Sequence, residues 1–120
     1  MKKQINLVKD FHKKFMQRVS EKPSLIPEDR SNNRYHLMKE EVEEYFAGAR
    51  KGDMENVAKE LADILYAVYG TIVEHGLQDK IEDIFEEVHK SNMSKEYHEY
   101  KMVKGQHYFK ADIHKFFQDK

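Results

Sequence analysis

The chain has 120 residues, a length near the mode for single domains, and its 21 basic and 22 acidic side chains give a formal net charge of −1. We therefore expect one domain over residues 1–120, without the global field that recruits a nucleic-acid polymer or an anionic membrane. Cysteine is absent, which excludes disulfides and thiolate chemistry, and no apolar run has the length of a secretory signal or a membrane span, so a cytoplasmic protein is expected.

Apolar residues at three- and four-residue steps predict a first helix over about residues 3–20, with Val19 as the last member of its stripe. His12 lies beside this stripe, so we expect it to pack in the core or to line a substrate site. Both prolines of the chain lie in the next segment, and proline biases the residue before it away from helical angles. This segment is predicted to be an ordered loop that ends near residue 33.

The second and third helices are predicted over residues 33–50 and 54–75, joined by a short turn. Gly52 is expected to stop the first of these helices and Asp53 to cap the other. The third helix has a second apolar flank, formed by Ala62, Tyr66, Tyr69 and Val73. A helix that is apolar on two sides is normally buried on two sides, and in a short chain another copy covers the second side most easily. We therefore expect a homodimer or a homotetramer.

A fourth helix is predicted over residues 77–90, after Gly76 ends the third. Short connections between neighbouring helices then predict an all-α fold, a small antiparallel bundle of four main helices. The pattern weakens in the tail, where we predict a turn or hairpin around Gly105 and a last helical turn capped by Asp112.

Two pairs of acidic residues form the main candidate functional site of this sequence. Glu41 and Glu44 lie on the second predicted helix, Glu60 and Asp63 lie on the third, and each pair has i, i+3 spacing. Such spacing places both carboxylates of a pair on one helical face, and the short turn lets the two pairs face each other. Four like charges in one small space favour a divalent cation. Oxygen ligands favour Mg²⁺, with Mn²⁺ as a substitute, and Mg²⁺ indicates phosphate chemistry.

Other interpretations stand beside the metal site. The acidic residues could form only the solvated face of a highly charged helix. Phe11, Phe15 and Tyr66 could stack a nucleobase, but aromatic residues at helical spacing are mostly core residues, and no base pocket is assigned to them. Glu86 and His89 have the Glu-x-x-His spacing of di-iron bundles, but that architecture needs two copies and the sequence has one.

The acidic pattern resembles that of the all-alpha nucleoside triphosphate pyrophosphohydrolases, which include MazG-like proteins and phosphoribosyl-ATP pyrophosphohydrolase. Their signature has two glutamates, two spacers and a glutamate, then a glutamate three residues before an aspartate on the next helix. The matching residues are Glu40, Glu41, Glu44, Glu60 and Asp63. Arg34 and the segments DFHKKF, VHKSNMSK and KMVKG also resemble the phosphoribosyl-ATP pyrophosphohydrolase-like branch. The tail segment HYFKAD departs from that pattern, because it lacks the expected prolines.

The resemblance implies a MazG-like fold and magnesium-dependent hydrolysis of a nucleoside triphosphate, or a related nucleotide, to the monophosphate and pyrophosphate. It implies that the two acidic pairs ligate the metal and that Glu41 also activates the attacking water. Glu40 is expected to contact a metal ligand and not the metal itself. Asn92 and Lys95 are expected near the phosphates, and Lys104 is a further candidate phosphate partner. The alternatives are hydrolysis of phosphoribosyl-ATP and a non-catalytic helical dimer that binds nucleotide or another partner.

Overall fold

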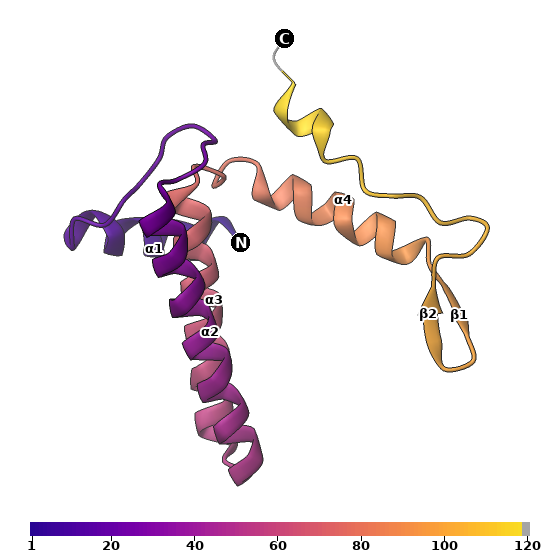
Figure 1. Cartoon of the computed structure of the whole chain (residues 1–120), viewed down its shortest axis with the longest axis horizontal. Helices are drawn as coiled ribbons and strands as arrows, with labels where there is room; N and C mark the ends of the chain where they lie inside the picture. Colours follow the sequence, from indigo (N-terminus) through magenta and orange to yellow (C-terminus); the bar gives the residue numbers. More distant parts are fainter. Residues whose placement is uncertain (119–120) are drawn as a thin grey trace. The chain divides into compact units, whose positions relative to one another are not determined.

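The computed structural model describes residues 1–118 and divides the chain into two compact units, Met1–Gln78 and Asp79–Lys120. The first unit contains helices α1 (Lys2–Lys14), α2 (Glu28–Lys51) and α3 (Met54–Glu74) (Figure 1). The second contains α4 (Ile81–Met93), strands β1 (Glu96–His98) and β2 (Lys101–Val103), and the 3₁₀ helix η1 (His114–Phe117). No helix within residues 1–118 has both the length and the apolar character needed to cross a bilayer. The all-α fold with four main helices is confirmed, whereas a single domain over the whole chain stays a prediction.

α1 ends at Lys14, earlier than predicted, because the chain reverses at the residues that follow. Met16 adopts a left-handed conformation with φ of 54°, and the Gln17 N–H donates to the His12 carbonyl at 2.7 Å. A left-handed residue followed by this hydrogen bond is the Schellman pattern that closes helices. Val19 therefore lies outside the helix, and its assignment to the helical stripe is wrong.

α2 begins at Glu28, before the predicted start near residue 33. Pro27 directly precedes the helix with φ of −55°, and its carbonyl accepts hydrogen bonds from the N–H groups of Arg30 and Ser31. Proline is well suited to the start of a helix, where an N–H would have no helical partner. The second proline therefore initiates the helix, and the loop is shorter than predicted.

The predicted turn between α2 and α3 is confirmed. Gly52 ends α2 in the left-handed conformation with φ of 70°, and the Asp53 side chain caps α3 by accepting from the Asn56 N–H at 3.1 Å. The two helices lie side by side, and α1 packs on α3 (Figure 1). Among residues 1–118, the buried apolar side chains come from α1 and α3 and are Ile5, Val8, Ala67 and Val73. α1 thus covers part of the second apolar flank of α3, which we expected another copy to cover.

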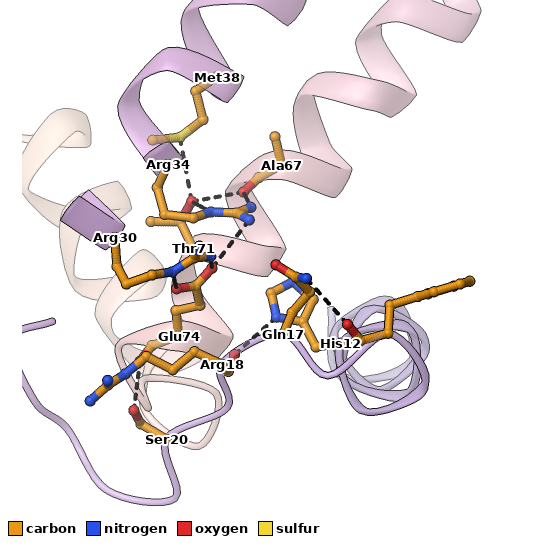
Figure 2. Close-up of polar contacts among 11 residues, drawn as sticks. His12, Gln17, Arg18, Ser20, Arg30, Arg34, Met38, Ala67, Thr71 and Glu74 are labelled. Atoms are coloured by element: carbon orange, nitrogen blue, oxygen red, sulfur yellow. Dashed lines mark hydrogen bonds and ion pairs between the residues drawn. The ribbon is translucent and has the colours of Figure 1, made fainter. Parts of the chain in front are cut away.

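A buried ionic network joins α2 to the end of α3 (Figure 2). The Glu74 side chain is fully buried and accepts hydrogen bonds from Nε and Nη2 of Arg30 at 3.0 and 2.7 Å. Nη1 of Arg34 lies 3.2 Å from the same carboxylate. Arg34 also donates to Thr71 Oγ1 at 3.1 Å and to the Ala67 carbonyl at 2.9 Å. Two arginines of α2 therefore fix the position of α2 along α3.

α4 begins at Ile81, and Leu77, the first residue of the predicted fourth helix, instead closes the end of α3 from outside that helix. The Leu77 N–H donates to the Ile72 carbonyl at 3.0 Å, and Gly76 before it has φ of 69°. This is the same Schellman pattern that closes α1. Gly76 therefore ends the third helix as predicted, but the apolar spacing assigned Leu77 to the wrong element.

The tail of the second unit agrees with the prediction at Gly105 and differs from it at Asp112. The predicted turn around Gly105 is present, because the Tyr108 N–H donates to the Gly105 carbonyl at 3.1 Å. A hairpin lies just before it and turns at Glu99 and Tyr100, whose φ values of 49° and 65° fit a type I′ turn. Asp112 does not cap the last helical turn, since the residue that precedes η1 is Ile113 and no side chain caps it. The Asp112 backbone N–H donates instead to the buried Glu87 carboxylate at 3.2 Å.

The substitution Glu74→Gln tests the buried network. It should lower the free energy of unfolding by about 3 kcal/mol or more, because it leaves two arginines facing an uncharged partner in a buried site. Urea denaturation measures this loss. The matched control is Glu21→Gln, which removes the exposed partner of the half-buried Lys9 in an ion pair of 3.6 Å. It should change stability by less than about 1 kcal/mol, and equal losses for the two variants would contradict the assignment.

Candidate metal centre

Three carboxylates from α2 and α3 meet at one point of the first unit. One oxygen from each of Glu41, Glu60 and Asp63 lies within 4.8 Å of the others. Glu41 comes from α2 and the other two from α3, so the antiparallel pairing of these helices builds the cluster. Glu60 is buried, with 7% of its surface exposed, and the other two are half-buried.

The other two acidic candidates lie on the same stretch of α2. Glu44 is exposed and is not one of the three residues whose oxygens converge, but its charge acts on both Glu41 and Glu60. It therefore lies beside the cluster, at its solvent side. Glu40 is exposed as well and does not belong to the cluster.

The cluster is electrostatically unfavourable without a cation. Burial raises the pKa of Glu41 to about 7, and repulsion from the neighbouring carboxylates adds to this effect. Burial and the contact with Glu44 also raise the pKa of Glu60. The Oε2 atoms of Glu41 and Glu60 are buried without a hydrogen-bond partner. A buried polar atom without a partner costs free energy, so these two oxygens favour a ligand.

Lys59 neutralises part of this charge. Its Nζ lies 2.6 Å from Asp63 and 3.9 Å from Glu60, and the hydrogen bond to Asp63 raises the pKa of Lys59. The Lys59 side chain is 69% exposed. Exposed ion pairs of this kind contribute little to stability, so a divalent cation can displace the lysine.

The residues present fit a hard divalent cation. The converging donors are carboxylate oxygens, two of them in glutamates with an unpartnered buried oxygen. Mg²⁺ and Mn²⁺ prefer such oxygen ligands, whereas zinc sites are usually built from histidine and cysteine. Glu41, Glu60 and Asp63 are therefore the residues that would hold the metal, with Glu44 next to them.

A cavity of about 300 Å³ adjoins the cluster. Glu41 and Asp63 contribute to its lining, together with Phe11, His12, Arg34, Leu37, Tyr66 and Ala67. His12 is 2% exposed and lines the cavity, which agrees with both roles expected for it.

The three aromatic residues expected in the core are exposed in the single chain. The exposed fractions of Phe11, Phe15 and Tyr66 are 43%, 50% and 42%, so the core prediction is wrong. The Phe11 ring contacts the other two rings, with centroids at 4.8 Å from Phe15 and 5.4 Å from Tyr66. The helices of the first unit therefore cover these rings only in part.

The remaining predicted site residues belong to the second unit. Asn92 is exposed near the end of α4, Lys95 is half-buried just after it, and Lys104 is exposed. The Lys104 Nζ lies 5.2 Å from the centre of the Tyr108 ring. The roles of these residues at the phosphates stay predictions.

Sequence reasoning did not identify Lys59 or Glu74. A lysine four residues before an aspartate on one helical face was a usable signal for the first. The signal for Glu74 was a carboxylate at the end of a strongly apolar helix, matched by Arg30 and Arg34 one turn apart on the preceding helix.

The comparison with protein families identifies the chain. The family model described as phosphoribosyl-ATP pyrophosphohydrolase matches residues 8–92. The chain belongs to this family. The match spans the whole acidic cluster, and members of the family are pyrophosphohydrolases, which are typically dependent on divalent metals. The chain is therefore a nucleotide pyrophosphohydrolase of the MazG-like superfamily, and the resemblance in its acidic motif is confirmed. A comparison with curated proteins finds no match.

The raised pKa of Glu41 predicts how the stability of the metal-free protein depends on pH. The folded state keeps this proton up to about pH 7, whereas an unperturbed glutamate loses it near 4.5. Between these values the folded state binds more protons, so its free energy of unfolding falls as the pH rises. Glu41→Gln should remove this part of the fall when denaturation is measured in a chelator. The stability gained by the variant over wild type should therefore grow from pH 4.5 to pH 7.

The exposed neighbour Glu43 provides the control for this experiment. Glu43→Gln should differ from wild type by an amount that does not change over the same pH range. A flat difference for Glu41→Gln would show that Glu41 titrates as an ordinary carboxyl.

Proposed function

We propose that the chain hydrolyses a nucleoside triphosphate, or a close relative, to the monophosphate and pyrophosphate in a reaction that requires Mg²⁺ or Mn²⁺. Glu41, Glu44, Glu60 and Asp63 hold the metal. One observation carries the proposal: three carboxylates from two helices converge within 4.8 Å, and two of them have a buried oxygen without a partner. In a chain of the pyrophosphohydrolase family, this is the group of side chains best suited to the metal.

The acidic residues of the site have two roles in this proposal, which are to hold the metal and to accept a proton. When bound, the metal supplies positive charge for the phosphate oxygens and lowers the pKa of a water molecule. Glu41 accepts the proton of the attacking water, because it lines the cavity next to the cluster and has an oxygen free of other partners. The water attacks the α-phosphorus in line and pyrophosphate leaves. Glu40 does not bind the metal in this proposal, and instead orients one of the carboxylates that do.

The phosphate partners in this proposal are the three residues that the resemblance assigns to the phosphates. Lys95 and Lys104 provide point charges for a triphosphate, and Asn92 provides an amide donor. The resemblance of the VHKSNMSK and KMVKG segments to the family supports these assignments. A cytoplasmic location remains part of the same expectation.

A homodimer or homotetramer is also part of the proposal. Large apolar side chains of α2 and α3 stay exposed in the single chain, among them Val42, Phe46, Leu61 and Leu65 at 49%, 55%, 47% and 52%. Exposed apolar side chains concentrated on two adjacent helices are typical of an interface between subunits.

Phosphoribosyl-ATP is the second candidate substrate, because the matching family carries its name. The metal site would serve either substrate, since both reactions cleave a phosphoric anhydride next to the α-phosphorus. The substrates differ in the shape of their nucleoside part. A non-catalytic dimer is disfavoured by membership in a family of hydrolases.

A panel of canonical nucleoside triphosphates together with phosphoribosyl-ATP tests the reaction. With Mg²⁺ present, at least one member should release pyrophosphate and the corresponding monophosphate, and a chelator should abolish this release. Pyrophosphate and orthophosphate are measured separately. Orthophosphate as the only product would show that a different bond is cleaved and would contradict the proposed reaction.

The substitution Glu60→Gln tests the metal site, because it removes one charge at nearly constant volume. Turnover should fall about 100-fold or more, and the stabilisation of wild type by saturating Mg²⁺, about 2.7 kcal/mol at a hundredfold excess over Kd, should shrink. The melting temperature in chelator should stay equal or rise, because one member of a repelling cluster is neutralised.

The exposed Glu43→Gln serves again as the control and should retain activity and the response to Mg²⁺. A structural ion pair at Glu60 predicts the opposite pattern, with a lower melting temperature and normal turnover in the folded fraction. That pattern would remove Glu60 from the metal site.

A further inference from the structure

Two aromatic residues belong to the lining of the cavity beside the acidic cluster. Phe11 and Tyr66 line this cavity, whereas the third aromatic residue of the group, Phe15, does not. The exposed fractions of Phe11 and Tyr66 are 43% and 42%. His12 and Arg34 belong to the same lining and are only 2% and 5% exposed. The cavity therefore combines two buried polar residues with two aromatic rings that residues 1–118 leave partly uncovered.

The rings of Phe11 and Tyr66 form a corner. Their centroids lie 5.4 Å apart and their planes make an angle of 89°, which is the favourable edge-to-face arrangement. The Phe15 ring also contacts Phe11, with centroids 4.8 Å apart. A flat group that lies parallel to one ring of the corner is perpendicular to the other. It can therefore stack on the first ring and meet the second edge to face, and both arrangements favour an aromatic group.

The corner lies close to the candidate metal ligands. Asp63 and Tyr66 are three residues apart on α3, which places them on one helical face and about 4.5 Å apart along the helix axis. Glu41 and Asp63 line the cavity together with the two rings. A phosphate held by a metal on these carboxylates therefore brings the group attached to it towards the rings. In a nucleotide, the attached group is a sugar with its base.

We propose that Phe11 and Tyr66 bind the base of the nucleotide substrate by aromatic stacking. The inference rests on the proposed function, because the metal-bound phosphate determines where the nucleoside lies. Every base has a flat π-face that can stack on an aromatic side chain, and neither the sugar nor the phosphates have one. The cavity volume of about 300 Å³ is at the lower end for small-molecule sites, which suits one part of a nucleotide.

Other occupants fit this lining less well. An anion without a metal would meet the carboxylates of Glu41 and Asp63. An apolar side chain from another copy of the chain would cover the rings, but it would also remove water from these carboxylates at a cost in free energy. A base that is joined to a metal-bound phosphate satisfies both the aromatic and the acidic part of the lining.

The test compares the best nucleotide of the panel described above with ribose 5-triphosphate, which has the sugar and the phosphates but no base. The measurement is kcat/KM for pyrophosphate release with Mg²⁺. Wild type should prefer the nucleotide about tenfold or more, mainly through KM, since stacking on an aromatic side chain is worth about this factor. Phe11→Leu and Tyr66→Leu should each reduce this preference, because leucine keeps an apolar side chain and removes the π-face.

Two control variants make the result specific. Tyr66→Phe keeps the ring and should keep the preference for the nucleotide. Phe15→Leu removes a ring that is 50% exposed but does not line the cavity, and it should keep the preference as well. The stabilisation by Mg²⁺ and the particle mass in sedimentation should stay at wild-type values in each variant. If Phe11→Leu does not fold, Tyr66→Leu decides the question.

Three results would overturn the stacking site and leave the proposed reaction standing. The first is a wild type that cleaves the nucleotide and ribose 5-triphosphate equally well. The second is a preference that both leucine variants retain. The third is an equal loss on both substrates with a changed particle mass, which would assign the rings to a subunit interface. If wild type releases pyrophosphate from no nucleotide, the proposed function itself is overturned, and the stacking site with it.

Discussion

The burial of Glu74 is the constraint on which the rest of the first unit depends. A carboxylate without access to water requires compensation at every oxygen, and Arg30 and Arg34 provide it from α2. A helix shifted by one residue relative to its neighbour would turn its side chains by about 100°. The pairing of these charges therefore selects one register of α2 along α3, and in that register Glu41 faces Glu60 and Asp63.

The Glu74 network and the acidic cluster both join α2 to α3, but they have opposite effects on the stability of the folded chain. The arginine network is fully paired and holds α2 against α3 at one end of the hairpin. The acidic cluster is incompletely paired, and its raised pKa values show that the folded chain does not favour all of its charges. An arrangement that costs stability in the metal-free protein is expected at a functional site, where the bound ligand offsets the cost.

Local signals in the sequence predicted the parts of the fold that local interactions decide. Gly52 and Asp53 define the α2–α3 turn through backbone freedom and side-chain capping, so their types alone were sufficient. The convergence of Glu41 with Glu60 and Asp63 followed from helical spacing and this short turn. The cluster was predictable because each step in its construction is short in sequence.

The features that the sequence did not predict depend on an unusual backbone conformation and on contacts between residues far apart in the sequence. The closure of α1 uses Met16 in a left-handed conformation that usually favours glycine, and no residue type signalled it. The exposure of Phe11 depends on which surfaces the other helices leave uncovered, and sequence spacing does not contain that information. Glu74 and its arginines are far apart in sequence, so their pairing emerges only once the helices are packed.

In the ion pair between Lys59 and Asp63, the lysine ammonium occupies a position that another cation could take. The ammonium group occupies the outer edge of the cluster with its side chain in water, where it can leave without unfolding any element. A divalent cation bound there would replace the lysine ammonium at the Asp63 carboxylate, so the local charge would rise by less than the charge of the metal. The displaced lysine would stay within one helical turn of the cluster, where it could pair with phosphate groups. Lys59 would then serve as a counter-charge for the carboxylates in the metal-free protein and as a further positive charge beside the metal when it is bound.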